Sequence, residues 1–182
     1  MFKRMKKSGV RPNLCTYNAL MGGHFKNANV EEAQALYGKM IENRWMPNAI
    51  SFATLIDGLC KFGKISDVRK MFFVEMTRHG VLRTVPIYNC LIDGYCKLGN
   101  LDEAFELYTE MRKGKLPPDA VTYGILIKGL CNVKIVLEEA GLLSKMLRDG
   151  TLANSVIYNT VIDGNCKQGD LKKGNGNLFT DE

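Results

Sequence analysis

The apolar residues between positions 88 and 111 fall on two successive helical stripes. The first stripe has the spacing i, i+3, i+4, i+7 and i+8, which places side chains on one face of an α-helix. Its members are Tyr88, Leu91, Ile92, Tyr95 and Cys96. The second stripe consists of Leu101, Ala104, Phe105, Tyr108 and Met111. The pattern predicts two helices joined by a short turn.

Glycine and polar residues at the joint indicate where one helix ends and the next begins. Glycine takes the left-handed conformation that closes many helices. The glycines in this place are Gly63, Gly99 and Gly169. The residue pairs with the spacing of a capping box are Asn29 with Glu32 and Asn100 with Glu103. Each pair predicts the start of a second helix.

The two-helix pattern recurs along the chain. An aromatic residue opens each copy, with spacings of 35, 36, 35 and 35 residues, at Tyr17, Phe52, Tyr88, Tyr123 and Tyr158. Two further columns keep this step: Gly23, Gly58, Gly94, Gly129 and Gly164, and Met5, Met40, Met76, Met111 and Met146. The one extra residue falls between Met71 and Met76. Such a period indicates a repeat protein.

One helix pair cannot bury both apolar stripes alone, so neighbouring pairs must stack on one another. We therefore expect an all-α fold, an α-solenoid of stacked antiparallel helix pairs that forms one domain. Four whole repeats are expected at 14–48, 49–84, 85–119 and 120–154. The end of a truncated repeat is expected at 1–13, and a truncated, degenerate repeat at 155–182.

The order of residues inside one repeat is complete from Tyr88 to Asp119. It reads Tyr-Asn-x-Leu-Ile-Asp-Gly-x-Cys-Lys-x-Gly, then Leu-Asp-Glu-Ala, Glu-Met and Pro-Asp. This order resembles the pentatricopeptide repeat family in its P-type form. Tetratricopeptide repeats share the paired helices but have a 34-residue period and another motif. The resemblance implies a right-handed superhelix that binds single-stranded RNA, one base per repeat, in a plant mitochondrion or chloroplast.

The family reads each base with the residue after the aromatic and the last residue of the repeat. By resemblance the pairs are Asn18 with Asn48, Ala53 with Thr84, Asn89 with Asp119, and Gly124 with Asn154. Asn13 and Asn159 belong to the two incomplete repeats. The resemblance implies uracil for the Asn89 pair and a pyrimidine, preferably cytosine, for the Asn18 pair. Ala53 and Gly124 offer no polar group, so we expect little discrimination there.

The last residue of each repeat has a second interpretation. Asn13, Asn48, Asp119 and Asn154 stand where a helix N-cap is expected, and Asn and Asp are preferred caps. Capping alone would explain these residues. A cap that faces the RNA could also serve both roles.

The residue two places before each aromatic is apolar in four of the five repeats. These residues are Cys15, Ile50, Pro86, Val121 and Val156. The resemblance implies that they wedge between adjacent bases. The alternative for any one of them is ordinary packing between helices.

A column of lysines could contact the RNA backbone. Its members are Lys26, Lys61, Lys97 and Lys167, and Asn132 interrupts the series. If three or four of them neutralise phosphates, log affinity should fall with log salt at a slope of roughly −2 to −3. The alternative is a solvated lysine near a helix C-terminus, where the helix dipole favours a positive charge.

Composition adds little to the repeat and excludes some functions. The net charge of +6 is weak support for a polyanionic partner. Cys60, Cys96, Cys131 and Cys166 share one column, and stacked helices about 10 Å apart cannot bring them to one zinc ion. We expect buried structural thiols there. Two histidines without a catalytic motif predict no enzyme activity, and no metal, cofactor, small-molecule substrate or membrane partner is predicted.

Two other functions stay open at this point. A tetratricopeptide-like scaffold would hold a peptide in its groove in place of RNA. The chain could also be a nonfunctional fragment, since it starts and stops within second helices and ends in a glycine-rich tail. The sequence shows no targeting peptide.

Overall fold

The computed structural model describes residues 9, 12–133 and 136–167 of the chain. All regular elements in these ranges are helices. None of the described helices is both long enough and apolar enough to cross a membrane. The chain divides into two compact parts, Met1–Arg83 and Thr84–Glu182, which we call the N-terminal part and the C-terminal part.

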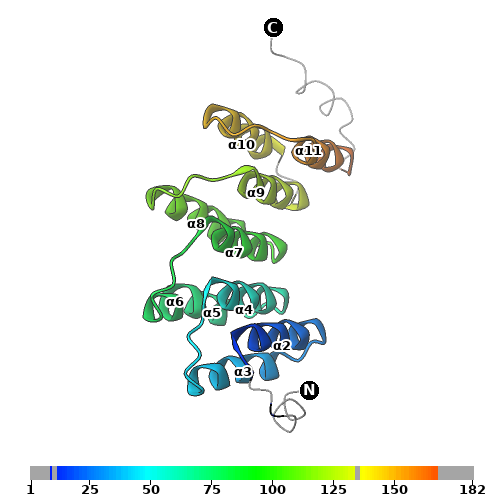
Figure 1. Cartoon of the computed structure of the whole chain (residues 1–182). Helices are drawn as coiled ribbons and strands as arrows, with labels where there is room; N and C mark the ends of the chain where they lie inside the picture. The colour runs from blue at the N-terminus through cyan, green and yellow to red at the C-terminus, as the bar shows by residue number, and fades with distance from the viewer. Residues whose placement is uncertain (1–8, 10–11, 134–135, 168–182) are drawn as a thin grey trace. The chain divides into compact units, whose positions relative to one another are not determined.

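The N-terminal part contains two stacked helix pairs. Its elements are α2 (Leu14–Lys26), α3 (Val30–Glu42), α4 (Ala49–Lys61), α5 (Ile65–Lys70), the π-helical turn η1 (Met71–Glu75) and α6 (Met76–Arg78). Helix α2 packs against α3 and α4, and α4 packs against α5 and η1 (Figure 1). The first helices of the two pairs therefore lie side by side.

The π-helical turn accommodates the extra residue of the 36-residue repeat. A π-helix bonds residue i to residue i+5, so its turn holds one residue more than an α-helical turn. Phe72 and Met76 are both fully buried on either side of the insertion. The wider turn thus keeps the apolar stripe continuous. The sequence prediction that the extra residue lies between Met71 and Met76 is confirmed.

The C-terminal part continues the same arrangement. Its helices are α7 (Val85–Lys97), α8 (Leu101–Lys113), α9 (Ala120–Val133), α10 (Val136–Arg148) and α11 (Ser155–Lys167). Helix α9 packs between α7 and α11, while α8 packs against α7 and α9, and α10 against α9 (Figure 1). Helices α7, α9 and α11 form a row of first helices. The predicted all-α fold of stacked helix pairs is confirmed.

The first helices end as the glycines predict, but the second helices are not capped as predicted. Gly63 and Gly99 have φ of +66° and +78°, in the left-handed region; Gly169 lies outside the described residues. Asn29 and Asn100 precede α3 and α8, yet neither makes a side-chain cap bond. The expected capping boxes with Glu32 and Glu103 were therefore wrong.

The backbone explains this difference. The amide N–H of Asn29 donates to the carbonyl of His24 (2.9 Å), and that of Asn100 donates to the carbonyl of Tyr95 (3.0 Å). Each bond closes the preceding helix with the six-to-one bond of a Schellman motif. The backbone N–H that would donate to a capping-box glutamate is therefore already used.

Small and large side chains alternate where the first helices meet. A β-carbon added to Gly58 would lie 2.4 Å from the Phe25 ring, and one added to Gly129 would lie 2.7 Å from Cys96 Sγ. The same addition at Gly164 would lie 2.5 Å from Cys131 Sγ. These three glycines therefore let α4, α9 and α11 approach a side chain of the first helix before them.

The cysteine column is buried only in part. Cys60 and Cys96 are buried as expected, and burial, with a smaller contribution from Asp93, raises the pKa of the Cys96 thiol to about 12. Cys131 is half-buried, and Cys166 is exposed, which contradicts the expectation for that residue. The glycine of the following repeat covers Cys96 and Cys131, whereas no described helix packs over Cys166.

Candidate nucleic-acid interface

The reading positions lie at equivalent places on the first helices. Asn89, Gly124 and Asn159 stand on α7, α9 and α11, the row of the C-terminal part, while Asn18 and Ala53 stand on α2 and α4. Their exposure differs. Asn159 is exposed, Asn18 is half-buried, and Asn89 is buried, with only 7% of its surface exposed. A reading side chain was expected to be accessible, so the surroundings of Asn89 need an explanation.

Asn89 is held by the start of the following first helix. Its Nδ2 donates to Asp119 Oδ1 (3.2 Å), and the Thr122 hydroxyl donates to Asn89 Oδ1 (2.7 Å). Thr122 is itself fully buried, and its backbone N–H donates to Asp119 Oδ1 (2.8 Å). Asn89, Asp119 and Thr122 form a cluster, which we call the reading cluster. Asp119 is its exposed member.

The reading cluster keeps Asp119 ionised. Partial burial alone would raise the pKa of the carboxyl group. Hydrogen bonds from the Thr122 backbone, from Asn89 and from the Val121 backbone act against burial, and the pKa is lowered. The outer edge of the cluster is therefore a negative hydrogen-bond acceptor at neutral pH.

The cap interpretation of the last residues holds in each described case. Asn13 and Asn48 form capping boxes with Thr16 and Ser51. Asn154 Oδ1 accepts from the Ile157 backbone N–H at 3.0 Å, and Asp119 caps α9 as described above. Capping leaves base reading open, because Asp119 bonds to Asn89 at the same time.

The first reading pair differs from the third. Asn48 Oδ1 accepts from the backbone N–H (3.0 Å) and the hydroxyl (3.1 Å) of Ser51. The Oδ1 atom of Asn18 is buried and has no hydrogen-bond partner. The amide of Asn18 is therefore not fixed in the way that the amide of Asn89 is.

The five wedge positions face solvent. Ile50, Val121 and Val156 are 63%, 58% and 68% exposed, and Cys15 and Pro86 are exposed as well. Packing between helices therefore does not account for these residues. Exposed aliphatic side chains beside the reading positions offer apolar surface to a stacked base.

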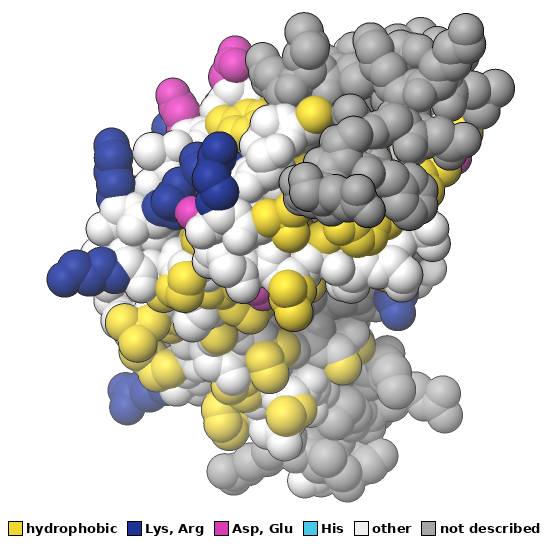
Figure 2. All heavy atoms as spheres, turned by 90° about the horizontal axis from the view of Figure 1, so that it is seen from above, with side chains coloured by type: hydrophobic (Ala, Val, Ile, Leu, Met, Phe, Trp, Pro, Cys, Tyr) yellow, Lys and Arg dark blue, Asp and Glu magenta, His cyan; other side chains and the backbone are white. Residues whose placement is uncertain are grey.

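The lysine column is partly neutralised by aspartates. Lys61 Nζ lies 2.6 Å from Asp57 Oδ2, and Lys97 forms the same i, i+4 ion pair with Asp93. Lys26 is exposed, and the Lys167 side chain lies outside the described residues. Figure 2 shows lysine and arginine side chains at several points of the visible face.

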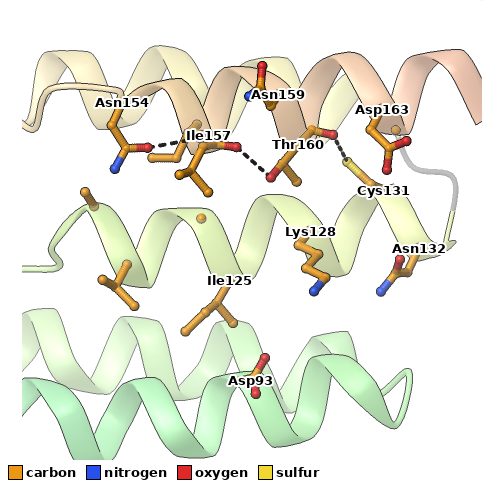
Figure 3. A pocket seen from close by; sticks show the side chains of 15 residues that line it. Asp93, Ile125, Lys128, Cys131, Asn132, Asn154, Ile157, Asn159, Thr160 and Asp163 are labelled. Atoms are coloured by element: carbon orange, nitrogen blue, oxygen red, sulfur yellow. Dashed lines mark hydrogen bonds between the residues drawn. The ribbon is translucent and has the colours of Figure 1, made fainter.

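The fourth repeat departs from both columns. Lys128 stands in the aspartate column, and Asn132 stands in the lysine column. Figure 3 shows Lys128 on α9, with Asp163 on α11 and Asp93 on α7 on either side. The lysines were considered above without the aspartates four residues before them, so the ion pairs were missed. The i, i+4 spacing would have revealed the ion pairs.

A groove of about 800 Å³ opens between α9 and α11 in the C-terminal part (Figure 3). Gly124, Ile125, Lys128, Asn159 and Asp163 are among the residues that line it. The absence of a side chain at Gly124 contributes to this space. A β-carbon there would meet Ile157 Cγ1 at 3.6 Å, an ordinary contact.

The repeats match models of known repeat families. The model described as PPR repeat family matches residues 12–61 and 83–132. The model described as PPR repeat matches residues 50–81, 121–151 and 156–175. The chain belongs to the pentatricopeptide repeat family.

Curated pentatricopeptide repeat proteins of Arabidopsis thaliana resemble the chain at moderate identity. One is 30% identical over 127 residues, which is 68% of this chain and 21% of the relative. A chloroplastic one is 26% identical over 152 residues, 82% of this chain and 19% of the relative. A mitochondrial one is 27% identical over 142 residues, which is 78% of this chain and 23% of the relative. The chain spans about a fifth of the length of these relatives.

Solved pentatricopeptide repeat structures share the fold. The pentatricopeptide repeat protein PPR10 in complex with an 18-nt psaJ RNA element matches with a TM-score of 0.89 at 24% identity, over 97% of this chain and 26% of PPR10. The PPR domain of Arabidopsis thaliana protein-only RNase P 1, in complex with tRNA, matches with a TM-score of 0.66 at 15% identity, over 88% of this chain and 84% of that domain.

Proposed function

We propose that the chain binds single-stranded RNA, with one repeat facing one base, as part of an organellar protein that processes, stabilises or controls translation of a transcript. The observation that carries the proposal is the reading cluster, where Asn89 and Asp119 of the third repeat are joined beside exposed Val121 of the fourth. The RNA named with PPR10 and with RNase P 1, and the organelles named for two relatives, support the proposal.

The reading cluster matches the edge of uracil in chemistry. One hydrogen of Asn89 Nδ2 is used by Asp119, and the second is left to donate. The Asp119 carboxylate supplies an acceptor. Uracil presents an N3–H donor beside carbonyl acceptors, so the donor and acceptor of the cluster complement it. Val121, two positions after Asp119, would contact the face of the base.

The proposed mechanism is occupancy of the RNA. Bases would stack against the exposed aliphatic residues, readers would select two of them, and lysines would approach the phosphates. Because the Lys61 and Lys97 ammonium groups already face carboxylates, the salt dependence should be shallower than four independent lysines would give. No step of this mechanism requires bond chemistry in the repeats.

A fluorescence-anisotropy titration with labelled RNA tests the proposal. We expect the chain to bind single-stranded pyrimidine-rich RNA more tightly than the same sequence in a duplex, and Asn89→Ala with Asp119→Ala to weaken this binding. The matched control is Asn29→Ala with Asp102→Ala, which removes the same residue types from exposed positions that make no cap bond. Equal binding by both double variants, or no binding by the parent chain, would refute the proposal.

A protein-binding scaffold is the second candidate, and the groove beside Gly124 is the observation that favours it. Such a groove could hold an extended peptide, and the lysine–aspartate pairs reduce the attraction for a polyanion. Competition separates the two functions. Under the RNA proposal, heparin and unlabelled single-stranded RNA displace the probe, whereas a scaffold would show no RNA binding to displace.

A further inference from the structure

Beyond the two reading residues, the Thr122 hydroxyl stands out as a buried polar group at the centre of the reading cluster. It lies on α9, three residues after Asp119, and it reaches back to Asn89 on α7 at 2.7 Å. It is the only donor within the described structure that bonds to Asn89 Oδ1. Thr122 therefore contacts the reading residue of one repeat from the helix of the next.

The hydroxyl has two acceptors and one hydrogen. Asn89 Oδ1 lies at 2.7 Å and Asp119 Oδ1 at 2.9 Å from Thr122 Oγ1. Asp119 Oδ1 already accepts from the Thr122 backbone N–H and from Asn89 Nδ2. Asn89 Oδ1 would be left buried without a donor if the hydroxyl turned away, which is costly. The hydrogen therefore belongs on the bond to Asn89.

These bonds fix the amide of Asn89 at both ends. Nδ2 is directed to the carboxylate and Oδ1 to the hydroxyl. The reverse orientation would place Oδ1 against the Asp119 carboxylate, where two acceptors repel each other. With both ends held, one N–H hydrogen of Nδ2 makes no bond to the described residues and is left to donate to a base. The cluster thus presents a donor at Asn89 and an acceptor at Asp119.

The residue type at the position of Thr122 varies from repeat to repeat together with the reading residue. The residue three places after each repeat end is polar where the preceding reader is polar and aliphatic where it is not. The pairs are Asn18 with Ser51, Ala53 with Ile87, Asn89 with Thr122, and Gly124 with Ile157. The contact is also present without the hydroxyl, since Ile157 Cγ1 would meet a β-carbon on Gly124 at 3.6 Å. The polarity of the two positions therefore changes together. Among these pairs Thr122 bonds to its reader, whereas the Ser51 hydroxyl donates to Asn48 and leaves Asn18 Oδ1 without a partner among the described residues.

We propose that Thr122 is a positioning residue that holds the Asn89 amide with its N–H outward and thereby sets the preference of the third repeat for uracil. This inference rests on the proposed RNA binding and deepens it. Thr122 does not itself contact the base in this account. Its hydroxyl acts through Asn89, so its loss should alter base preference more than affinity for the strand.

Binding to paired RNAs tests the proposal. The RNAs are oligoadenosines that carry one cytidine and one uridine separated by one adenosine, in either order, and the same RNAs with guanosine in place of the uridine. We expect the preference of the parent chain for uridine to fall by about fivefold or more in Thr122→Val. Thr122→Ser restores the hydroxyl and should keep the preference. Thr109→Val makes the same chemical change on exposed α8 and should leave the preference unchanged.

The outcomes distinguish this proposal from the proposed function. If the parent chain binds none of the RNAs, the RNA function fails and this inference with it. If the parent chain prefers uridine and Thr122→Val prefers it equally, the positioning role alone is wrong. Equal loss in Thr122→Ser and Thr122→Val also overturns it, because the hydroxyl is then not the cause.

A gain of preference supplies an independent test should Thr122→Val not fold. Gly124→Asn creates a reader in the fourth repeat, and Gly124→Asn with Ile157→Thr adds its hydroxyl support. We expect the double variant to gain a base preference, next to the uridine position, that the single variant lacks.

A side-chain NMR spectrum of Asn89 without RNA provides a further readout. The amide hydrogens of Asn89 should exchange slowly in the parent chain and faster in Thr122→Val. Equal behaviour within either comparison would contradict the proposal.

Discussion

The glycine column makes a sharp prediction about stability, because Gly129 lies against Cys96 in the row of first helices. A β-carbon at Gly129 would stand 2.7 Å from Cys96 Sγ, 3.0 Å from Cys96 Cβ and 3.1 Å from Leu101 Cδ2. Alanine gains about 0.8–1 kcal/mol over glycine in a helix interior. Overpacking of a buried contact costs about 1–3 kcal/mol. Gly129→Ala should therefore lower the free energy of unfolding by up to about 2 kcal/mol.

Gly141→Ala is the matched control for this substitution. Gly141 also lies inside a helix, α10, but a β-carbon there would meet no atom within 4 Å. That variant should be more stable than the parent by about 0.5–1 kcal/mol. Urea unfolding followed by circular dichroism measures both variants. Adding Cys96→Ala to Gly129→Ala should recover part of the loss. A Gly129→Ala protein as stable as Gly141→Ala would refute the described packing.

Three further predictions concern charge and thiol chemistry. Asp93→Asn removes the carboxylate that is paired with Lys97. The RNA affinity measured by anisotropy should therefore rise about two- to fivefold at low salt. An unchanged or lower affinity would count against a role of Lys97 at phosphates. The lowered pKa of Asp119 adds stability that is present above the unfolded-state pKa of about 3.9 and is lost as pH falls through the folded-state pKa. The stability advantage of the parent chain over Asp119→Asn should therefore shrink from pH 5 to pH 3, and a constant difference would contradict the cluster. Burial raises the pKa of the Cys96 thiol to about 12. A maleimide at neutral pH should therefore modify Cys96 at least about a hundredfold more slowly than exposed Cys15, as followed by mass spectrometry. Comparable rates would show that Cys96 is accessible.

The sequence was sufficient to predict the repeat because each repeat is built from local patterns. The aromatic column at Tyr17, Phe52, Tyr88 and Tyr123 is buried in the structure, and a stripe with helical spacing requires no knowledge of distant residues. The left-handed glycines at 63 and 99 are equally local. Stacking follows, because each helix pair leaves an apolar face to be covered.

The surroundings of the readers could not be predicted in the same way. The burial of Asn89 depends on the offset between α7 and α9, which places Thr122 beside a residue 33 positions earlier. The failed capping boxes depend on backbone bonds at the ends of the preceding helices, which already use the amide N–H groups of Asn29 and Asn100. By contrast, Ser51 and Thr122 follow their caps by three residues, so the hydroxyl positions were visible in the sequence once their columns were compared.

Selection from a pool of randomised single-stranded RNA tests most directly whether stacked repeats read successive bases. Because Ala53 offers no polar side chain between the repeats that carry Asn18 and Asn89, we expect two enriched positions, one pyrimidine and one uracil, separated by a single unselective position. Enrichment at adjacent positions, at another spacing, or of no sequence at all would contradict this expectation.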